Sequence, residues 1–198
     1  MIPILILAAG RSSRMRGADK LLEPVDGQAL LRRQAERAIA TGAPVFITVP
    51  QLDHPRVGCL RGLDVTTVVV PDAAEGIGAS LRTGMAALPD FDAVLVTLAD
   101  LVALETADLS RVIRARDHAP DALIWRGTSD KGDPGHPILF DAGLRDAFAS
   151  LKGDVGGAGV IKAHTDKVHL VALPGDRARI DLDTPEDWAA WRTKRVAH

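Results

Sequence analysis

The segment from Ala8 to Lys20 combines small residues with positive charge in a way that points directly to chemistry. Ala8, Ala9 and Gly10 carry side chains too small to shield the backbone, so their N–H groups are open to close approach by an anion. Backbone donors next to several cations are typical of a site for a polyphosphate. The cations that follow the small residues are Arg11, Arg14, Arg16 and Lys20.

This segment has neither of the two common phosphate-binding fingerprints. Gly10 is not followed by the second glycine and the Lys-Ser/Thr pair of a Walker P-loop, and no G-x-G-x-x-G pattern opens the chain. A basic loop of this kind is also typical of a solvated surface turn. Composition alone therefore leaves two interpretations, an anion site and a solvated loop.

Short aliphatic runs that alternate with amphipathic stretches would have to position this segment. Each run is too short for a typical helix and has no polar face, as expected of parallel strands covered on both sides. The alternation predicts an α/β fold, a Rossmann-like, mostly parallel sheet with helices on both faces, whose ligands bind beyond the carboxyl ends of the strands. The predicted strands are 2–7, 45–49, 65–70, 93–98, 122–125 and 167–173, and the clearest helices are 29–40, 79–88 and 106–117.

The pattern loosens after about residue 126, where Gly, Pro and Asp are frequent. Two short helices are predicted there, at 141–149 and 156–164. The last helix has a clear start because Thr184 is a favourable N-cap, Pro185 suits the first position, and two acidic residues follow.

Composition restricts the class of protein. The 198 residues suit one domain, 1–198, and 46% hydrophobic with 25% charged residues is ordinary for a globular chain. A formal net charge of −2 predicts no general attraction to nucleic acid or to a membrane. Cys59 is the single cysteine, so no intrachain disulfide is expected, and no stretch has the length of a membrane span or the character of a secretory signal. These observations favour the cytoplasm.

The stretch LAAGRSSRMRGADKLL resembles the signature L-A-A-G-x-S-x-R-M-G-x-x-K-L of the MobA-like nucleotidyltransferases, with Arg16 as one additional residue. This family includes the cytidylyl- and guanylyltransferases of the molybdenum cofactor. The resemblance implies that the loop wraps an NTP triphosphate. It implies catalytic roles for Arg14, at the β- and γ-phosphates, and for Lys20, at the α-phosphate. The nucleotide-binding residues it implies in the loop are Leu7, Ala8, Ala9, Gly10, Ser12, Arg14 and Lys20.

Nucleotidyl transfer needs a hard divalent cation, usually Mg2+, bound by one or two carboxylates. Asp100 directly follows the predicted strand 93–98, at the same end of the sheet as the loop, although the family's D-M-P has lost its proline here. The stretch RIDLDTPEDW resembles the family's D-I-D-T-P-E-D, and its Asp181 and Asp183 face the same side if extended. We predict Asp100 and Asp183 as the metal ligands. The alternative for each is a helix cap.

Further segments resemble family motifs around the two substrates. PDAAEGIGASLRTGM resembles the loop and helix that meet base and ribose, and a plain strand-to-helix turn is the alternative. GDPGHPILF and GDVGGAGV resemble segments near the acceptor, but the family's arginine after Ala158 is missing. His136 suggests a general base, whereas a lone His beside Pro is more often structural. The implied base and ribose contacts are Pro71, Gly76, Gly78 and Ser80, and the implied acceptor residues are Gly135, His136, Asp154 and Asp181.

The expected reaction transfers a nucleoside monophosphate from an NTP to an acceptor phosphate and releases pyrophosphate. In this family L-A-A-G openings are more typical of cytidylyl transfer, so Ala9 favours CTP. Molybdopterin is the acceptor implied by the resemblance alone, and a molybdoenzyme is an implied partner. Two alternatives stay open: transfer to methylerythritol phosphate or a sugar 1-phosphate, and a non-catalytic chaperone that binds a nucleotide or cofactor.

Overall fold

A seven-stranded sheet forms the centre of the molecule, in the order β5-β4-β1-β6-β8-β7-β9. The computed structural model describes residues 1–196, except for the side chains of Asp154, Arg195 and Val196. All strands of this sheet run in one direction except β8, which pairs antiparallel with both of its neighbours. The mostly parallel sheet is therefore confirmed. The strands are β1 Ile4–Leu7, β4 Val45–Val49, β5 Thr66–Val69, β6 Ala93–Leu98, β7 Ile124–Thr128, β8 Pro134–Asp141 and β9 Val168–Ala172.

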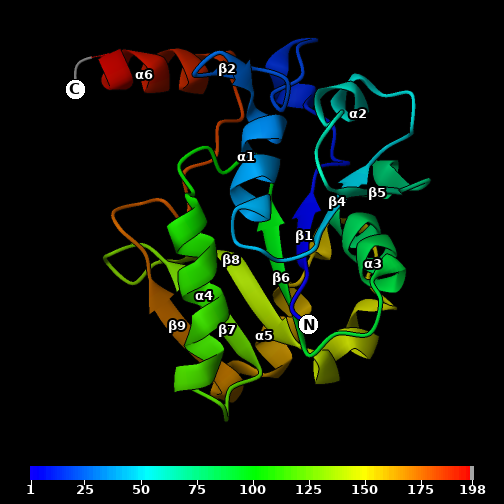
Figure 1. Ribbon diagram of the computed structural model, residues 1–198, viewed down its shortest axis with the longest axis vertical. Helices are drawn as coiled ribbons and strands as arrows, with labels where there is room; N and C mark the ends of the chain where they lie inside the picture. Colours follow the sequence, from blue (N-terminus) through cyan, green and yellow to red (C-terminus); the bar gives the residue numbers. More distant parts are fainter. Residues whose placement is uncertain (197–198) are drawn as a thin grey trace.

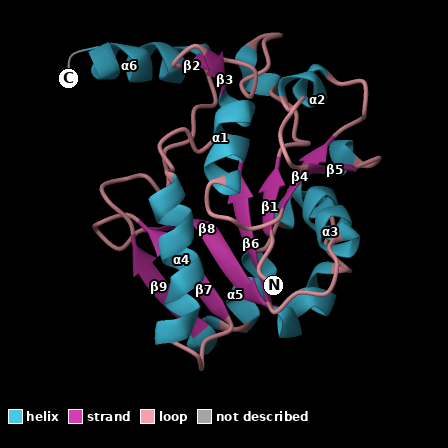
Figure 2. Ribbon diagram, viewed as in Figure 1, coloured by secondary structure: helices cyan, strands magenta, loops and turns pink. Residues whose placement is uncertain are grey.

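Helices cover both faces of the sheet (Figures 1 and 2). Buried side chains of α1 and α4 belong to the core on one face, and those of α3 and α5 belong to the core on the other. Among the described residues, no helix is both long and apolar enough to cross a membrane. The helices are α1 Leu30–Ile39, α2 Pro55–Cys59, α3 Ile77–Ala87, α4 Thr106–His118, α5 Ala158–Ala163 and α6 Pro185–Val196, with 3-10 turns at Ser13–Met15, Ala73–Glu75, Ala142–Phe148, Gly153–Val155 and Thr165–Lys167.

Strand β1 shows why its sequence is aliphatic without interruption. Ile4 and Ile6 pack into the core under α1 and α4, whereas Leu5 and Leu7 pack into the core under α3. Successive side chains of a strand point to opposite faces, so a strand covered on both sides needs an apolar residue at every position. This strand lies at the centre of the sheet, between β4 and β6, and the loop from Ala8 to Lys20 leaves its carboxyl end.

The region after residue 126 is more regular than its composition indicates. Strands β7 and β8 pair antiparallel, and β8 is inserted between β6 and β7. The strand predicted at 122–125 instead starts at Ile124 and continues to Thr128, because its pairing with β9 extends from Val168 to Ala172. A small hairpin, β2 Pro24–Val25 and β3 Gln28–Ala29, was not expected either.

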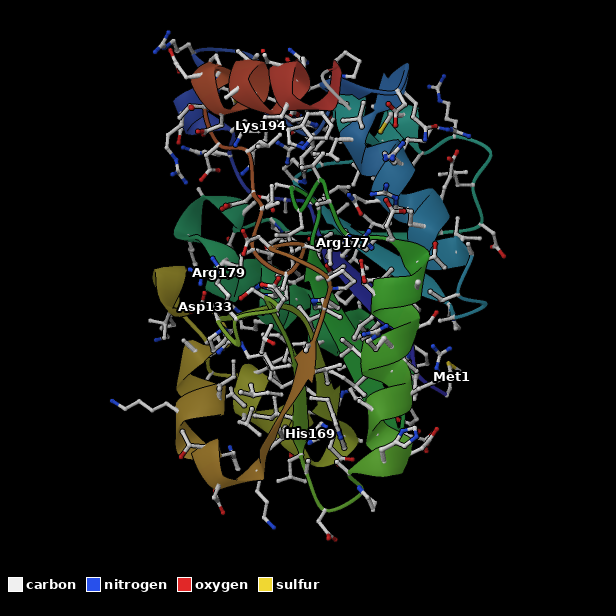
Figure 3. All side chains as sticks on the ribbon, turned by 90° about the vertical axis from the view of Figure 1, so that its left-hand side faces the viewer. Met1, Asp133, His169, Arg177, Arg179 and Lys194 are labelled. Carbon is white, nitrogen blue, oxygen red and sulfur yellow. The ribbon has the colours of Figure 1, made fainter. Side chains whose placement is uncertain are left out.

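The chain from β9 to α6 returns across the sheet and is held by polar contacts. Arg177 pairs with the buried Asp108 of α4 at 3.3 Å, and Arg179 pairs with Asp133 at 3.2 Å. Figure 3 shows Arg179 and Asp133 side by side, with Arg177 near the upper end of α4. The carbonyl of Ala178 also accepts a hydrogen bond from the backbone N–H of His136 at 2.9 Å. These contacts place the following residues, 181–183, over the carboxyl ends of the strands.

Candidate functional site

The loop from Ala8 to Lys20 is anchored beneath its surface by one arginine. Arg56 of α2 is buried, with 3% of its side chain exposed. Its guanidinium donates to the backbone carbonyls of Ala8 and Gly10 at 2.5 and 2.8 Å, and to both carboxylate oxygens of Asp19 at 2.7 and 2.8 Å. Burial by itself would raise the pKa of Asp19, but Arg56 outweighs this effect and the pKa is lowered. Arg56 therefore fixes the path of the loop at both its start and its end.

Lys20 lies at the end of this loop, between two carboxylates that come from distant parts of the chain. Its Nζ is 2.5 Å from Oδ2 of Asp100 and 2.7 Å from Oδ1 of Asp183. Only 16% of the Lys20 side chain is exposed. Burial by itself would lower the pKa of this ammonium, but the two carboxylates outweigh it and the pKa is raised. Lys20 is therefore protonated at neutral pH.

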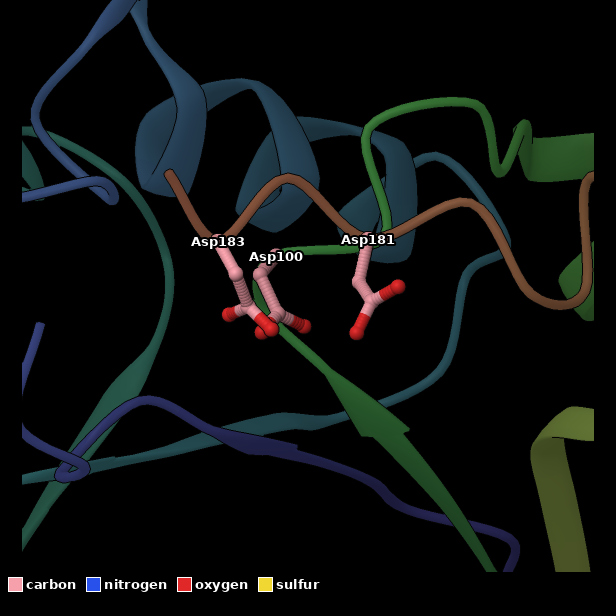
Figure 4. A group of neighbouring side chains, drawn as sticks. All are labelled: Asp100, Asp181 and Asp183. Atoms are coloured by element: carbon pink, nitrogen blue, oxygen red, sulfur yellow. The ribbon is translucent and has the colours of Figure 1, made fainter. Parts of the chain in front are cut away.

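Three aspartates meet above the carboxyl end of β6 (Figure 4). Ligand oxygens of Asp100, Asp181 and Asp183 lie within 4.8 Å of one another. The Oδ1 atom of Asp100 is buried and accepts no hydrogen bond from the described residues. The pKa of Asp181 is raised by burial and by the charges of the two other aspartates. An unpartnered buried oxygen among several carboxylates fits a hard divalent cation, which takes oxygen ligands.

Neither predicted metal ligand caps a helix, although capping was the alternative for both. Helix α4 begins at Thr106 with a capping box made by Glu105 and Asp108. Helix α6 is capped by Thr184, whose Oγ1 accepts from the N–H of Asp187 at 3.1 Å. The carboxylates of Asp100 and Asp183 are thereby left to face Lys20.

Two of the three exposed arginines of the loop pair with the C-terminal part of the chain. Arg14 lies 2.8 Å from Oδ2 of Asp183, and Arg16 lies 2.6 Å from Oε1 of Glu186 in α6. Arg16 has a left-handed backbone with φ of 52°. The additional residue at position 16 therefore connects the loop to the last helix.

Two adjoining hollows surround this group of charges. The first, which we call the central cleft, has a volume of about 160 Å³. The second, which we call the loop pocket, has a volume of about 550 Å³ and lies between the loop and the residues after β4 and β5. Of the sequence-predicted site residues, Leu7, Ala8, Gly10, Lys20, Ser80 and Asp100 line the central cleft, and Ala9, Gly10, Ser12 and Pro71 line the loop pocket.

Other sequence-predicted site residues have different surroundings. A Cβ at Gly78 would come within 2.7 Å of the carbonyl oxygen of Gly153, and one at Gly135 would collide with the backbone of Ala178. Both glycines therefore allow close packing of the chain. Gly76 precedes α3 with φ of 113°, which glycine tolerates. The side chain of Asp154 lies outside the described residues.

Two residues that sequence reasoning missed contribute to the site, Arg56 and Arg126. Arg56 occurs in a segment with no phosphate motif, and its role depends on the position of α2. Arg126 of β7 lies next to His136 in a third hollow, beside the central cleft. Burial and the charge of Arg126 lower the pKa of His136 to about 4, so its imidazole is neutral at physiological pH.

Comparisons with known proteins agree with this arrangement. The profile of the MobA-like NTP transferase domain matches residues 4–168. Nicotine blue oxidoreductase of Paenarthrobacter nicotinovorans is 29% identical over 92% of each chain. The structure of Rv0371c from Mycobacterium tuberculosis is 27% identical over 96% of each chain, with a TM-score of 0.82. Rv0371c in complex with manganese is also similar, with 26% identity over 96% of each chain and a TM-score of 0.79.

A more distant structure shows the same fold. The synthetase of CMP-2-keto-3-deoxy-manno-octonic acid, in complex with CTP, aligns with a TM-score of 0.77 at 12% identity. The alignment covers 99% of this chain and 98% of that one.

Replacing Arg56 with Gln should release the loop. We expect the free energy of unfolding to fall by about 3–5 kcal/mol, because Asp19 is left as a partly buried charge without its partner. Urea denaturation measures this loss, and hydrogen exchange should show faster exchange of amides in residues 8–20. The matched control is Arg61→Gln, an exposed arginine in the same region. Equal stability of the two variants would contradict the anchoring role of Arg56.

Acidification should destabilise the protein through His136. The pKa of His136 is about 4 in the folded chain and 6.5 for an ordinary, solvated imidazole, so the unfolded chain binds more protons between these values. The contribution of the neutral His136 to the free energy of unfolding is therefore fully present above pH 6.5, and it is lost as the pH falls toward 4. From pH 6.5 to 5 we expect a loss of at most about 2 kcal/mol from this group. Denaturation of the protein and of His136→Asn at each pH isolates the effect, and parallel pH profiles would refute it.

Proposed function

Because this chain belongs to the MobA-like NTP transferase domain family, we propose that it transfers CMP from CTP to an acceptor phosphate in a Mg2+-dependent reaction that releases pyrophosphate. The observation that carries this proposal is the position of Lys20, which faces Asp100 and Asp183 at the end of the small-residue loop. Cation, carboxylates and exposed backbone lie at one edge of the sheet, where phosphoryl chemistry needs all three.

The reaction needs no nucleophile from the protein. An oxygen of the acceptor phosphate forms the new bond to the α-phosphorus, while the bond to the β-phosphate oxygen breaks and pyrophosphate leaves. The loop positions the triphosphate, Lys20 stabilises negative charge at the α-phosphate, and Arg14 binds the departing pyrophosphate. Asp100 and Asp183 would hold the metal, which when bound supplies further positive charge to the phosphate oxygens.

A divalent cation is supported by the chain's own residues and by one similar structure. Asp100, Asp181 and Asp183 supply closely spaced oxygen donors, and one oxygen of Asp100 is buried without a partner. The manganese complex of Rv0371c supports the same class of metal. We propose Mg2+ as the ion in this protein because phosphate-binding enzymes use it with few protein ligands.

The preference for CTP rests on Ala9. This residue lines the loop pocket and is buried with Val70 and Ala79. Its methyl group occupies space that a glycine would leave open, which favours the smaller pyrimidine base. The synthetase of CMP-2-keto-3-deoxy-manno-octonic acid has the same fold and was solved in complex with CTP, which supports CTP as a nucleotide that this fold can bind.

Molybdopterin is the acceptor that we propose to test first, because the family resemblance implies it. Methylerythritol phosphate and a sugar 1-phosphate are the alternatives. All three carry the phosphate that the reaction requires, so the same assay compares them.

The similarity to nicotine blue oxidoreductase favours a second candidate function. The match covers 92% of each chain, and that relative is named as an oxidoreductase. In this candidate the same edge of the sheet binds a nucleotide cofactor, and no pyrophosphate is formed. Pyrophosphate release therefore separates the two functions, and nucleotide binding without turnover would indicate a non-catalytic binding protein.

Nucleotidyl transfer should depend on Lys20 and Asp100. With CTP, Mg2+ and a panel of acceptor phosphates, we expect Lys20→Met and Asp100→Asn each to lower turnover at least about 100-fold, because charge in the transition state loses a fixed partner. Labelled pyrophosphate measures the rate. Lys194→Met on α6 is the matched control and should keep the native rate. Near-normal turnover in either site variant would refute the assigned roles.

Replacing Ala9 with Gly should weaken the preference for CTP. We expect the ratio of GTP to CTP affinity to rise about tenfold, since removal of one methyl group makes room for a purine. Calorimetric titration of both proteins with both nucleotides measures the ratio. The same preference in the native protein and the variant would exclude Ala9 as the filter.

A further inference from the structure

A third hollow lies beside the central cleft and has a different character. Its volume is about 380 Å³, within the range of small-molecule sites. Leu7 and Ile77 line both hollows, so the two adjoin. We call it the Arg126 pocket. Its side walls come from α3, β6, β8 and α5 and are largely apolar, with Leu81, Val96, Ile138, Phe140 and Ile161.

Arg126 is exceptional among the described arginines that are not exposed. Its Nε donates to the carbonyl of Gly135 at 3.1 Å, but no described carboxylate lies within ion-pair distance of its guanidinium. Every other described arginine that is not exposed has a carboxylate within 4.0 Å. These are Arg32, Arg33, Arg37, Arg56, Arg82, Arg116, Arg145 and Arg177.

The surroundings of Arg126 leave its charge uncompensated. Burial removes water from its guanidinium, which disfavours the cation and lowers its pKa. The neighbouring His136 is neutral at physiological pH, so it does not balance the positive charge of Arg126. The other charged residue of the lining is Lys162, also a cation. A partly buried cation without a counter-ion is costly, so an anionic ligand would recover free energy by pairing with it.

The walls of the pocket restrict what else the ligand can carry. Aliphatic side chains and the ring of Phe140 offer contact area but no hydrogen bonds, and the polar side chains of the lining are limited to Arg126, His136, Lys162 and Thr165. A polyol placed there would lose hydrogen bonds to water and gain few in return. A flat ring system would bury its faces against the same walls without this loss.

We propose that the Arg126 pocket binds the apolar, ring-shaped body of an anionic substrate, and that Arg126 selects this substrate by pairing with its anionic group. Identification of this substrate as the acceptor rests on the proposed nucleotidyl transfer. The pocket then favours aromatic or heteroaromatic acceptors over sugar phosphates. Arg126 supplies, from β7, the acceptor-binding cation that the sequence lacks after Ala158.

Two dyes with the same aromatic body test the pocket without any turnover. 8-Anilinonaphthalene-1-sulfonate carries a negative charge, and N-phenyl-1-naphthylamine lacks it. Fluorescence titration of the full chain should show about 10- to 100-fold tighter binding of the sulfonate, as expected for a charge-assisted contact. Arg126→Met should abolish this difference and leave binding of the neutral dye unchanged. Arg114→Met on the exposed side of α4 is the control.

Equal affinity of the native protein for the two dyes would overturn the proposal, as would an Arg126→Met variant that still prefers the sulfonate. Circular dichroism confirms that the variant folds, and Arg126→Gln replaces it if it does not. Competition extends the test to substrates: 1-naphthyl phosphate should displace the bound sulfonate, and glucose 1-phosphate should not. Displacement by both phosphates alike would overturn the selectivity.

The dye titrations test the Arg126 pocket and the pyrophosphate assay tests nucleotidyl transfer, so either proposal can be overturned without the other. Dye discrimination through Arg126 without pyrophosphate release supports the pocket and overturns nucleotidyl transfer. Pyrophosphate release without dye discrimination supports nucleotidyl transfer and overturns the Arg126 pocket.

Discussion

The contact of Lys20 with Asp100 and Asp183 is the interaction on which the rest of the site depends. It joins the loop after β1, the end of β6 and the segment before α6, residues that are 80 and 163 positions apart from Lys20. Three carboxylates within 4.8 Å repel one another. Lys20, and on the exposed side Arg14, offset this repulsion, so the aspartates can stay close enough together to bind a cation.

Arg56 and the C-terminal contacts form an outer layer that keeps this cluster in place. Arg56 holds the loop by its carbonyls and by Asp19, while Arg16 and Arg177 tie the returning chain to the loop side and to α4. A reacting group misplaced by a small distance loses much of its catalytic effect, so rigid support of the loop matters as much as its charges. Arg56 therefore acts on function indirectly, by holding the loop from Ala8 to Lys20 in position.

Polar and apolar binding surfaces are divided between neighbouring hollows. The central cleft and the loop pocket carry backbone donors and charges suited to phosphates, whereas the Arg126 pocket carries hydrocarbon walls together with the cations Arg126 and Lys162. Leu7, the last residue of β1, lines both the central cleft and the Arg126 pocket. The fold thus brings an ionic site and an apolar site into contact at the carboxyl end of one central strand, where open α/β sheets bind ligands.

Local sequence patterns were sufficient to predict the α/β class, the central strands and the residues at their carboxyl ends. These features depend on local periodicity: uninterrupted apolar runs mark strands covered on both faces, and acids or small residues directly after a strand must lie at that edge. Thr184 was recognisable as a cap because capping uses neighbouring residues only. Asp100 and Asp183 were predicted as a pair from their motifs, whereas Asp181, which was assigned to the acceptor, lies in the same cluster.

Contacts between segments far apart in the chain could be found only in the folded molecule. The insertion of β8 depends on pairing with β6 and β7, and no local pattern encodes a partner strand. The roles of Arg56 and Arg126 follow from what lies next to them, a carboxylate in one case and none in the other. An arginine has the same letter in a solvated loop, a buried anchor and a ligand pocket, and its chemistry is set by burial and by the charges that the fold places around it.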